Sequence, residues 1–403
     1  MQKRNFKILS MDGGPSLVVY CRLLREAVRQ IRDSDPEGKY PGFFDQIDLI
    51  SGSSAGALLG LKLNVLRNKY PNLEDEDTIF AELVDFADDV LRYCNVSLDG
   101  AIRTIFSQGT CVTTEEVQEF LQDSYGDTTM KELSIPLMVL SYQVDRYGSK
   151  QDVGGISRPN MFFSHFDAAH EAEAQAQSLT AADLGARTSA CSIWFPIYQS
   201  NLDGGFSTNN PSMAAVSRLV ALGRKSENPK IKGITTEDMT VLTMGMEVPD
   251  LGMQFGEIQQ PSDPWGWIQW IGPNWGQWIR SIAASPTNIP SVLNEITSAA
   301  RQEPHTFCLF LSAIFNGFGQ GINSILTQLL PPGQVLRLAV PTEKNLGPAL
   351  LLMFTGQAED LIDDAQTTYD KWVKEGNPLD YTPSLEQTKE WLLSRWFDGV
   401  EVA

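Results

Sequence analysis

Two short apolar runs, each followed by a glycine-rich turn and a helical pattern, constrain the fold of this chain more than any other feature. The first run covers residues 6–11 and is followed by Asp12-Gly13-Gly14-Pro15. The second covers residues 47–51 and is followed by Gly52-Ser53-Ser54-Ala55-Gly56. Short apolar runs bounded by turns are typical of strands buried on both faces. The repeated order of strand, turn and helix predicts a mostly parallel sheet.

The rest of the chain extends this pattern. Further strands are predicted at residues 137–141, 240–244 and 335–340, and capping signals predict helices after Asn209-Asn210-Pro211 and after Thr382-Pro383-Ser384. No repeat or low-complexity linker divides the chain. We therefore expect one α/β domain over residues 1–403, a three-layer sandwich with extra helices. The last of these would form a C-terminal helical extension over about residues 377–403.

Charge and cysteine content exclude several classes of protein. The chain has 31 Lys and Arg against 50 Asp and Glu, a net charge of −19, which opposes binding to nucleic acid. The 5 cysteines are scattered without a CxxC pair, a pattern that suits buried thiols in a reducing compartment. No export signal and no uninterrupted apolar run of membrane-spanning length is visible. The sequence therefore predicts a cytoplasmic protein.

Ser54 is the candidate nucleophile. A GxSxG sequence between a strand and a helix holds its serine in a strained, exposed turn, and Gly52 and Gly56 leave the space that this turn needs. The alternative is a Gly/Ser turn that only caps a helix. The backbone N–H groups of Gly13 and Gly14 are candidate oxyanion donors, with an ordinary β-turn as the alternative. Nucleotide binding is excluded because neither turn fits GxGxxG or GxxxxGK[ST].

A third motif, Asn201-Leu202-Asp203-Gly204-Gly205, places an aspartate at a turn where Gly204 allows close approach of another backbone. Alone, it would be a plain Asp-Gly turn. Together with the Asp12 and Ser54 turns, it makes the sequence resemble the patatin-like phospholipase family, acyl hydrolases that use a Ser–Asp dyad without histidine. The resemblance extends from about Phe6 to about Trp372.

The resemblance implies that Ser54 is the nucleophile and Asp203 its base, and that the substrate is a phospholipid or another acyl lipid. It implies no metal and no organic cofactor. A carboxylate is a weak base for a serine hydroxyl, so we expect a low-dielectric pocket that raises the pKa of Asp203. The oxyanion would be held by Gly13 and Gly14, with the amide of Ala55 beside the nucleophile.

The chain departs from the family at one point. The family usually continues its oxyanion loop with a third glycine, a basic residue and a further glycine, whereas this chain reads Gly14-Pro15-Ser16-Leu17-Val18. Pro15 has no N–H to donate. The alternative function is therefore a catalytically silent or ligand-gated lipid-binding effector of the same fold.

The histidines allow two other sites. Ser54, Asp203 and His305 follow the order of an α/β-hydrolase triad, but no turn signature links His305 to the other two, so we favour the dyad. A second group could bind a metal, although its histidines are five residues apart and off a common helical face, which favours a solvated segment. Its members are His165, Asp167, His170 and Glu171.

A tryptophan segment lies in a predicted lid-like insertion at about residues 257–330. Five of the nine tryptophans fall within residues 265–278, interrupted by glycines and prolines. Indole rings suit a lipid interface or a lid over an acyl pocket, and Trp267, Trp270 and Trp278 are the candidate contacts. Packing against the domain body is the alternative. Peripheral membrane contact is thus one hypothesis; nothing in the sequence indicates an oligomeric state.

Overall fold

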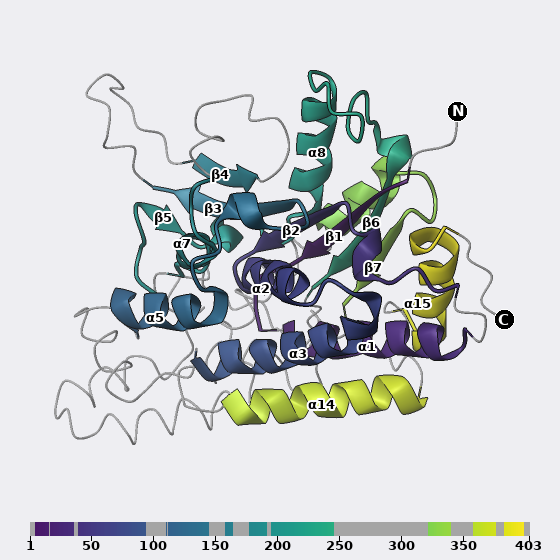
Figure 1. Ribbon diagram of the computed structural model, residues 1–403, viewed down its shortest axis with the longest axis horizontal. Helices are drawn as coiled ribbons and strands as arrows, with labels where there is room; N and C mark the ends of the chain where they lie inside the picture. Colours follow the sequence, from purple (N-terminus) through teal and green to yellow (C-terminus); the bar gives the residue numbers. More distant parts are fainter. Residues whose placement is uncertain are drawn as a thin grey trace, which may run out of the picture.

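A mixed sheet organises the described part of the protein (Figure 1). The computed structural model describes residues 5–15, 17–35, 39–93, 110, 112–144, 158–163, 177–191, 195–245, 321–339, 358–375 and 383–398. The seven strands have the order β4-β3-β2-β1-β6-β7, and β5 also pairs with β3. Their bounds are β1 (Phe6–Met11), β2 (Leu49–Ser53), β3 (Leu137–Gln143), β4 (Arg158–Phe163), β5 (Asn201–Leu202), β6 (Met239–Met244) and β7 (Val335–Leu338).

The five strands from β3 to β7 in this order are parallel, whereas β4 and β5 are antiparallel to β3. The predicted strands 6–11, 137–141 and 240–244 are confirmed. The strand predicted at 47–51 is displaced by two residues, and the last strand ends at Leu338. Because parallel neighbours end at a common edge, the turns that follow β1 and β2 lie side by side there.

Helices cover both faces of the sheet. One face carries α1, α2 and α3, with α14 lying on α1 and α3; α8 and a helix at 321–329 lie on the other (Figure 1). The bounds are α1 (Leu17–Asp33), α2 (Ala55–Lys69), α3 (Glu76–Tyr93), α5 (Thr114–Tyr125), α7 (Ala181–Thr188), α8 (Ser212–Gly223), α14 (Ala358–Glu375) and α15 (Leu385–Trp391). Short 3-10 turns are η1 (Phe44–Gln46), η2 (Leu73–Asp75), η3 (Met130–Glu132), η4 (Gly204–Phe206) and η5 (Thr236–Asp238), and a π-helical turn is η7 (Leu392–Trp396). The predicted three-layer α/β architecture is confirmed.

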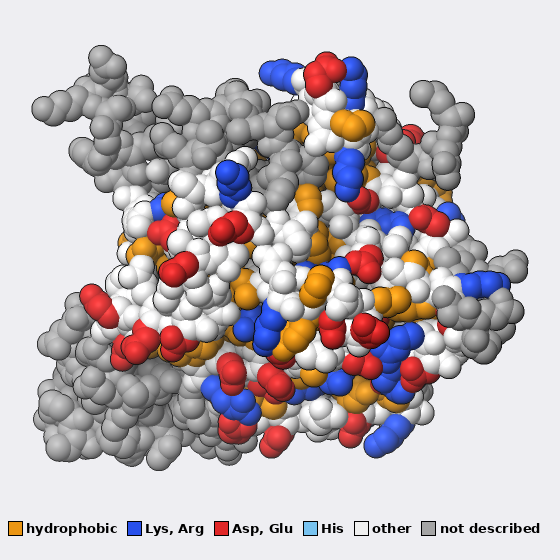
Figure 2. Space-filling model, viewed as in Figure 1, with side chains coloured by type: hydrophobic (Ala, Val, Ile, Leu, Met, Phe, Trp, Pro, Cys, Tyr) orange, Lys and Arg blue, Asp and Glu red, His pale blue; other side chains and the backbone are white. Residues whose placement is uncertain are grey.

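The outer helical face carries both acidic and basic side chains. Acidic and basic side chains alternate over α1, α3 and α14 (Figure 2). Several form exposed ion pairs, such as Arg92 with Glu359 of α14. Exposed pairs of this kind contribute little stability each. In the described part of the chain, no helix is long and apolar enough to cross a membrane.

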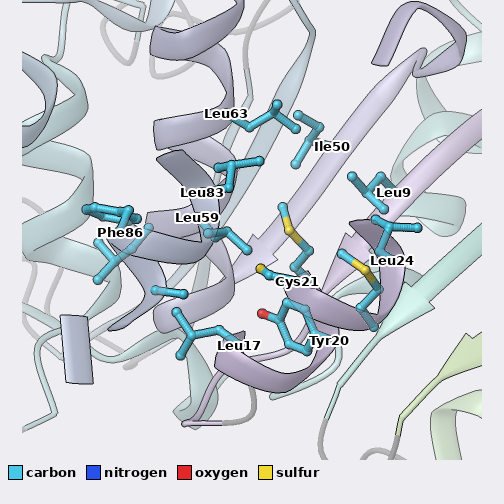
Figure 3. Close-up of a cluster of buried hydrophobic side chains, with 14 of the residues drawn as sticks. Leu9, Leu17, Tyr20, Cys21, Leu24, Ile50, Leu59, Leu63, Leu83 and Phe86 are labelled. Atoms are coloured by element: carbon cyan, nitrogen blue, oxygen red, sulfur yellow. The ribbon is translucent and has the colours of Figure 1, made fainter. Parts of the chain in front are cut away.

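Two apolar cores flank the sheet because side chains alternate between its faces. The larger core joins Leu9 and Ile50 of the sheet to α1, α2 and α3, with Tyr20, Cys21 and Leu59 packed between them (Figure 3). The smaller core, on the α8 side, is formed by Ile8, Leu49, Leu219, Val241 and Leu326. α2 is buried on almost all sides. Cys21 is a core thiol as expected, whereas Cys191 is only half-buried.

The end of the described chain belongs to the larger core. Ser384 caps α15 in a capping box with Gln387, and Trp396 stacks on Phe43 at a ring distance of 5.4 Å. Within the predicted insertion, residues 321–330 form the helix that places Leu326 and Leu330 in the smaller core. Residues 257–320, including Trp267, Trp270 and Trp278, lie outside the described residues.

Candidate active site

Ser54 lies in the sharp turn between β2 and α2. Its backbone has φ 50° and ψ −126°, a conformation that strains any residue other than glycine. The turn is possible because a Cβ on Gly52 would lie 2.4 Å from the Cα of Ala57, and one on Gly56 would lie 2.3 Å from the carbonyl oxygen of Met11. The predicted strand-to-helix elbow is therefore present, and both of its glycines are required by close contacts.

The side chain of Ser54 is hydrogen-bonded to Asp203. The Ser54 hydroxyl donates to Oδ2 of Asp203 at 2.5 Å, and the amide of Gly205 donates to Oδ1 at 2.7 Å. The Asp203 backbone is fixed by its own N–H, which donates to the carbonyl of Ala190 at 3.0 Å. Two turns that are 149 residues apart in the sequence thus place a hydroxyl and a carboxylate in contact. This is the geometry that a general base needs.

Asp203 is buried, with 7% of its surface exposed. Burial raises the pKa of its carboxyl group to about 6, although the hydrogen bonds from Ser54 and Gly205 act in the opposite direction. A carboxylate with this pKa is a stronger base than an ordinary aspartate and remains ionised at neutral pH. The expected increase in pKa is present.

Close packing brings the Asp203 turn to the elbow. A Cβ on Gly204 would lie 2.6 Å from the carbonyl of Leu140 and 2.7 Å from Oγ of Ser53. Thr188, at the end of α7, connects the turn after β2 to β3. Its Oγ1 accepts from the Ser54 amide at 2.9 Å and donates to the carbonyl of Leu140 at 2.6 Å. Gly204 and Thr188 therefore hold the Asp203 turn close to Ser54.

The turn with the predicted oxyanion donors Gly13 and Gly14 lies close to Ser54. A Cβ on Gly13 would lie 2.9 Å from Cβ of Ser54, and Gly14 has φ 107°, which favours glycine. The Gly13 amide donates to the carbonyl of Asn209 at 3.2 Å, and Nδ2 of Asn209 donates to the carbonyl of Gly13 at 3.3 Å. Among the described residues, the Gly13 donor is therefore occupied and the Gly14 N–H has no acceptor. Ala55 begins α2, where an N–H has no partner within the helix.

Three residues around the site were not predicted to have a role: Thr188, Asn209 and Arg337. The sequence marks Asn209 only as part of a helix cap. Arg337 pairs with the buried Asp12 at 2.8 Å and had no motif to mark it. A spacing rule could not find them, because their partners are distant in the sequence.

Other predicted residues lie outside the described part of the chain. These are His305 and the group His165, Asp167, His170 and Glu171. Within the described ranges, no group of three or more His, Cys, Asp or Glu side chains could hold a metal ion.

Comparison with known proteins identifies the family. A family profile described as "Patatin-like phospholipase" matches residues 9–216, about half of the chain, and this segment contains the Asp12, Ser54 and Asp203 turns. The chain belongs to the patatin-like phospholipase family. Membership in this family supports lipid acyl hydrolysis as the general class of activity.

Individual relatives of this patatin-like chain are distant. It is 22% identical to "Patatin-like protein 7" of Arabidopsis thaliana over 291 residues, 68% of this chain and 53% of that protein. The chain thus spans about half the length of this curated relative. VipD from Legionella pneumophila, a solved structure, is 9% identical, with a TM-score of 0.32 over 90% of this chain and 67% of that chain.

Proposed function

We propose that this patatin-like protein hydrolyses fatty-acyl carboxyl esters of lipids, with Ser54 as the nucleophile and Asp203 as its base. The observation that carries the proposal is the 2.5 Å hydrogen bond from the Ser54 hydroxyl to a buried carboxylate whose pKa is raised to about 6. Family membership supports the class of substrate. Phe206, three residues after Asp203, is an apolar side chain with 56% exposure, which suits contact with a lipid.

The reaction needs only residues of this chain and water. Asp203 takes the Ser54 proton as Oγ attacks the ester carbonyl, and it returns the proton to the departing alcohol when the acyl-enzyme forms. A water molecule then gives its proton to Asp203 and attacks the acyl carbon. Collapse of this second intermediate releases the fatty acid and restores the Ser54 hydroxyl.

The negative oxygen of each intermediate needs hydrogen-bond donors. We assign this role to the amides of Gly14 and Ala55, because the Gly13 amide is bonded to Asn209 and Pro15 has no N–H. Each well-placed donor contributes about 100- to 1,000-fold to such a reaction.

The test is lipid hydrolysis with product analysis by mass spectrometry, together with labelling by a fluorophosphonate probe. The native protein should release fatty acid and accept the probe, and Ser54→Ala should do neither. Ser53→Ala is the matched control, since it removes a neighbouring buried hydroxyl that has no hydrogen-bond partner among the described residues. A folded native protein that neither releases fatty acid nor reacts with the probe, in lipid or in detergent, would contradict the proposal.

A second candidate function is a silent or ligand-gated lipid-binding effector. The occupied Gly13 amide and the proline at position 15 favour it, because both reduce the number of oxyanion donors. Co-sedimentation with liposomes without release of fatty acid would support this alternative. Ready turnover of soluble p-nitrophenyl esters would exclude it.

We also propose, as part of the hydrolase assignment, that residues 1–403 form one domain in which about 257–330 include a lid or lipid-contact insertion and about 377–403 form a helical extension. Peripheral contact with a membrane surface would then involve Trp267, Trp270 and Trp278. The test of this part of the proposal is given in the Discussion.

A further inference from the structure

A buried ion pair lies directly behind the oxyanion loop. Asp12, the residue between β1 and Gly13, has 1% of its side chain exposed, and Arg337 of β7 has 6%. Nη2 of Arg337 donates to Oδ2 of Asp12 at 2.8 Å, and Nη1 donates to Oγ1 of Thr243 at 3.2 Å. A buried carboxylate is costly unless it is paired, so Arg337 compensates the charge that Asp12 brings into the interior.

The two members of this ion pair lie on opposite sides of β6 and meet across it. Arg337 lies beside Thr243 in the register of β6 and β7, and Asp12 follows β1 on the other side of β6. Between them is Gly245, where a Cβ would lie 2.1 Å from Oδ2 of Asp12 and 2.6 Å from Nη2 of Arg337. Only glycine at this position leaves room for the guanidinium to reach the carboxylate.

The pair is connected to the nucleophile through a short, rigid path. The Asp12 amide donates to the carbonyl of Met244 at 2.8 Å, and the next residue, Gly13, is bonded to Asn209 through both its N–H and its carbonyl. Gly13 then touches Ser54, and Gly14 follows with its N–H. Asp12, two residues before Gly14, is thus fixed both at its backbone and, through the ion pair, at its side chain.

We propose that Arg337 is a positioning residue for the oxyanion loop, holding Asp12 so that the Gly14 amide stays aimed at the carbonyl that Ser54 attacks. This inference rests on the proposed acyl-transfer function. Arg337 lies outside residues 9–216, the segment that matches the family profile, so the role comes from the structure of this chain.

Arg337→Lys tests the proposal. The variant keeps the positive charge but loses the planar fork that reaches both Asp12 and Thr243. We expect kcat for a monomeric ester to fall about 10- to 100-fold with KM within about two-fold, since a displaced donor acts in the transition state rather than in binding. The acidic limb of the pH profile should not move, because Asp203 is untouched. Hydrogen exchange at residues 12–14 should become faster.

Arg22→Lys is the matched control. Arg22 forms another buried pair, donating to both oxygens of Asp88 at 3.0 and 2.8 Å, and joins α1 to α3. This variant should lose comparable stability but keep the native kcat and the native exchange at residues 12–14. An equal loss of kcat in both variants would overturn the proposal, as would native kcat and exchange in Arg337→Lys.

Failure of the proposed function can be distinguished from failure of the positioning role of Arg337. If the native protein does not turn over esters, the proposed function fails, and exchange alone decides the role of Arg337. If exchange at residues 12–14 becomes faster in Arg337→Lys but not in Arg22→Lys, Arg337 still anchors the loop. Unchanged exchange in Arg337→Lys would overturn the positioning role. If Arg337→Lys does not fold, the double variant Asp12→Asn with Arg337→Gln removes both charges together and is judged by the same measurements.

Discussion

At the residue scale, Asp203 is subject to two opposing demands. It must be ionised to accept the Ser54 proton, but its burial favours the protonated form and raises its pKa to about 6. We predict that kcat/KM for a soluble ester rises with pH through about 6 and levels off above about 7. The measurement is a pH series with circular dichroism as a check on folding. A midpoint near 4, the ordinary value for an aspartate, would contradict the raised pKa of Asp203.

The same shift predicts how Asp203 affects stability. Its folded pKa lies above the ordinary value of 3.8, so its stabilising contribution is complete below that value and is lost as pH rises through about 6. At pH 7, the ionised side chain therefore costs up to about 3 kcal/mol. Asp203→Asn should lower ester turnover by about 100-fold or more and yet be more stable than native at pH 7. Near pH 4 the two proteins should be similar.

Urea denaturation at the two pH values measures this difference in the free energy of unfolding.

His305→Ala, assayed in parallel, should change turnover little. A folded but inactive His305 variant would replace the dyad with the three-residue triad.

Thr188 gives a third prediction. Thr188→Val keeps the shape of the side chain but removes the acceptor for the Ser54 amide and the donor to Leu140. We expect ester turnover to fall about 10-fold and stability to fall by about 1–2 kcal/mol, because a buried N–H loses its partner. Thr327→Val, at an exposed position of the helix at 321–329, is the control. Equal activity of both variants would show that the elbow does not depend on this hydrogen bond.

Sequence reasoning found the residues whose roles are marked by local chemistry. Ser54, Asp203 and the glycines beside them stand in short motifs, so their close approach could be predicted. The partners of Asp12 and Gly13 could not be predicted in this way, because Arg337 is 325 residues from Asp12 and Asn209 is 196 residues from Gly13. Which side chain fills such a gap depends on the register of the sheet, which no short motif encodes.

At the element scale, contact between α2 and β1 sets the position of the elbow. Gly56→Ala would place a methyl group 2.3 Å from the carbonyl of Met11, so α2 would have to move away from the sheet. We expect a loss of about 1–3 kcal/mol from overpacking and a large loss of turnover. The control, Gly321→Ala, has nothing within 4 Å of the added Cβ and should be close to neutral. Thermal unfolding and ester turnover measure the two effects.

The strands show which elements a sequence makes visible. β1 and β6 are buried along their whole length and β3 along its first five residues, and the sequence predicts all three because central parallel strands are rich in apolar residues. β4 contains Pro159 and lies at the edge of the sheet, and β5 has only two residues. Neither has a detectable pattern, although β5 leads directly to Asp203.

At the scale of the whole molecule, the net charge of −19 limits how the protein could meet a lipid surface. General electrostatic attraction is not available, so aromatic partitioning would have to supply the binding. We predict that replacing Trp267, Trp270 and Trp278 with Ser lowers activity on vesicles far more than on a short-chain monomeric ester, with little dependence on salt. Equal losses on both substrates would indicate a lid or pocket wall, and global unfolding would indicate core packing.

The position of β6 and β7 in the sheet also bears on how such a protein could be shortened. The segment matched by the family profile, residues 9–216, contains both members of the dyad, yet β1 pairs on one side with β6, which begins at Met239. A fragment cut after the match would have every reacting group but would expose the open edge of β1 and leave Asp12 without Arg337. The smallest unit that can fold here is therefore larger than the smallest unit that contains the chemistry.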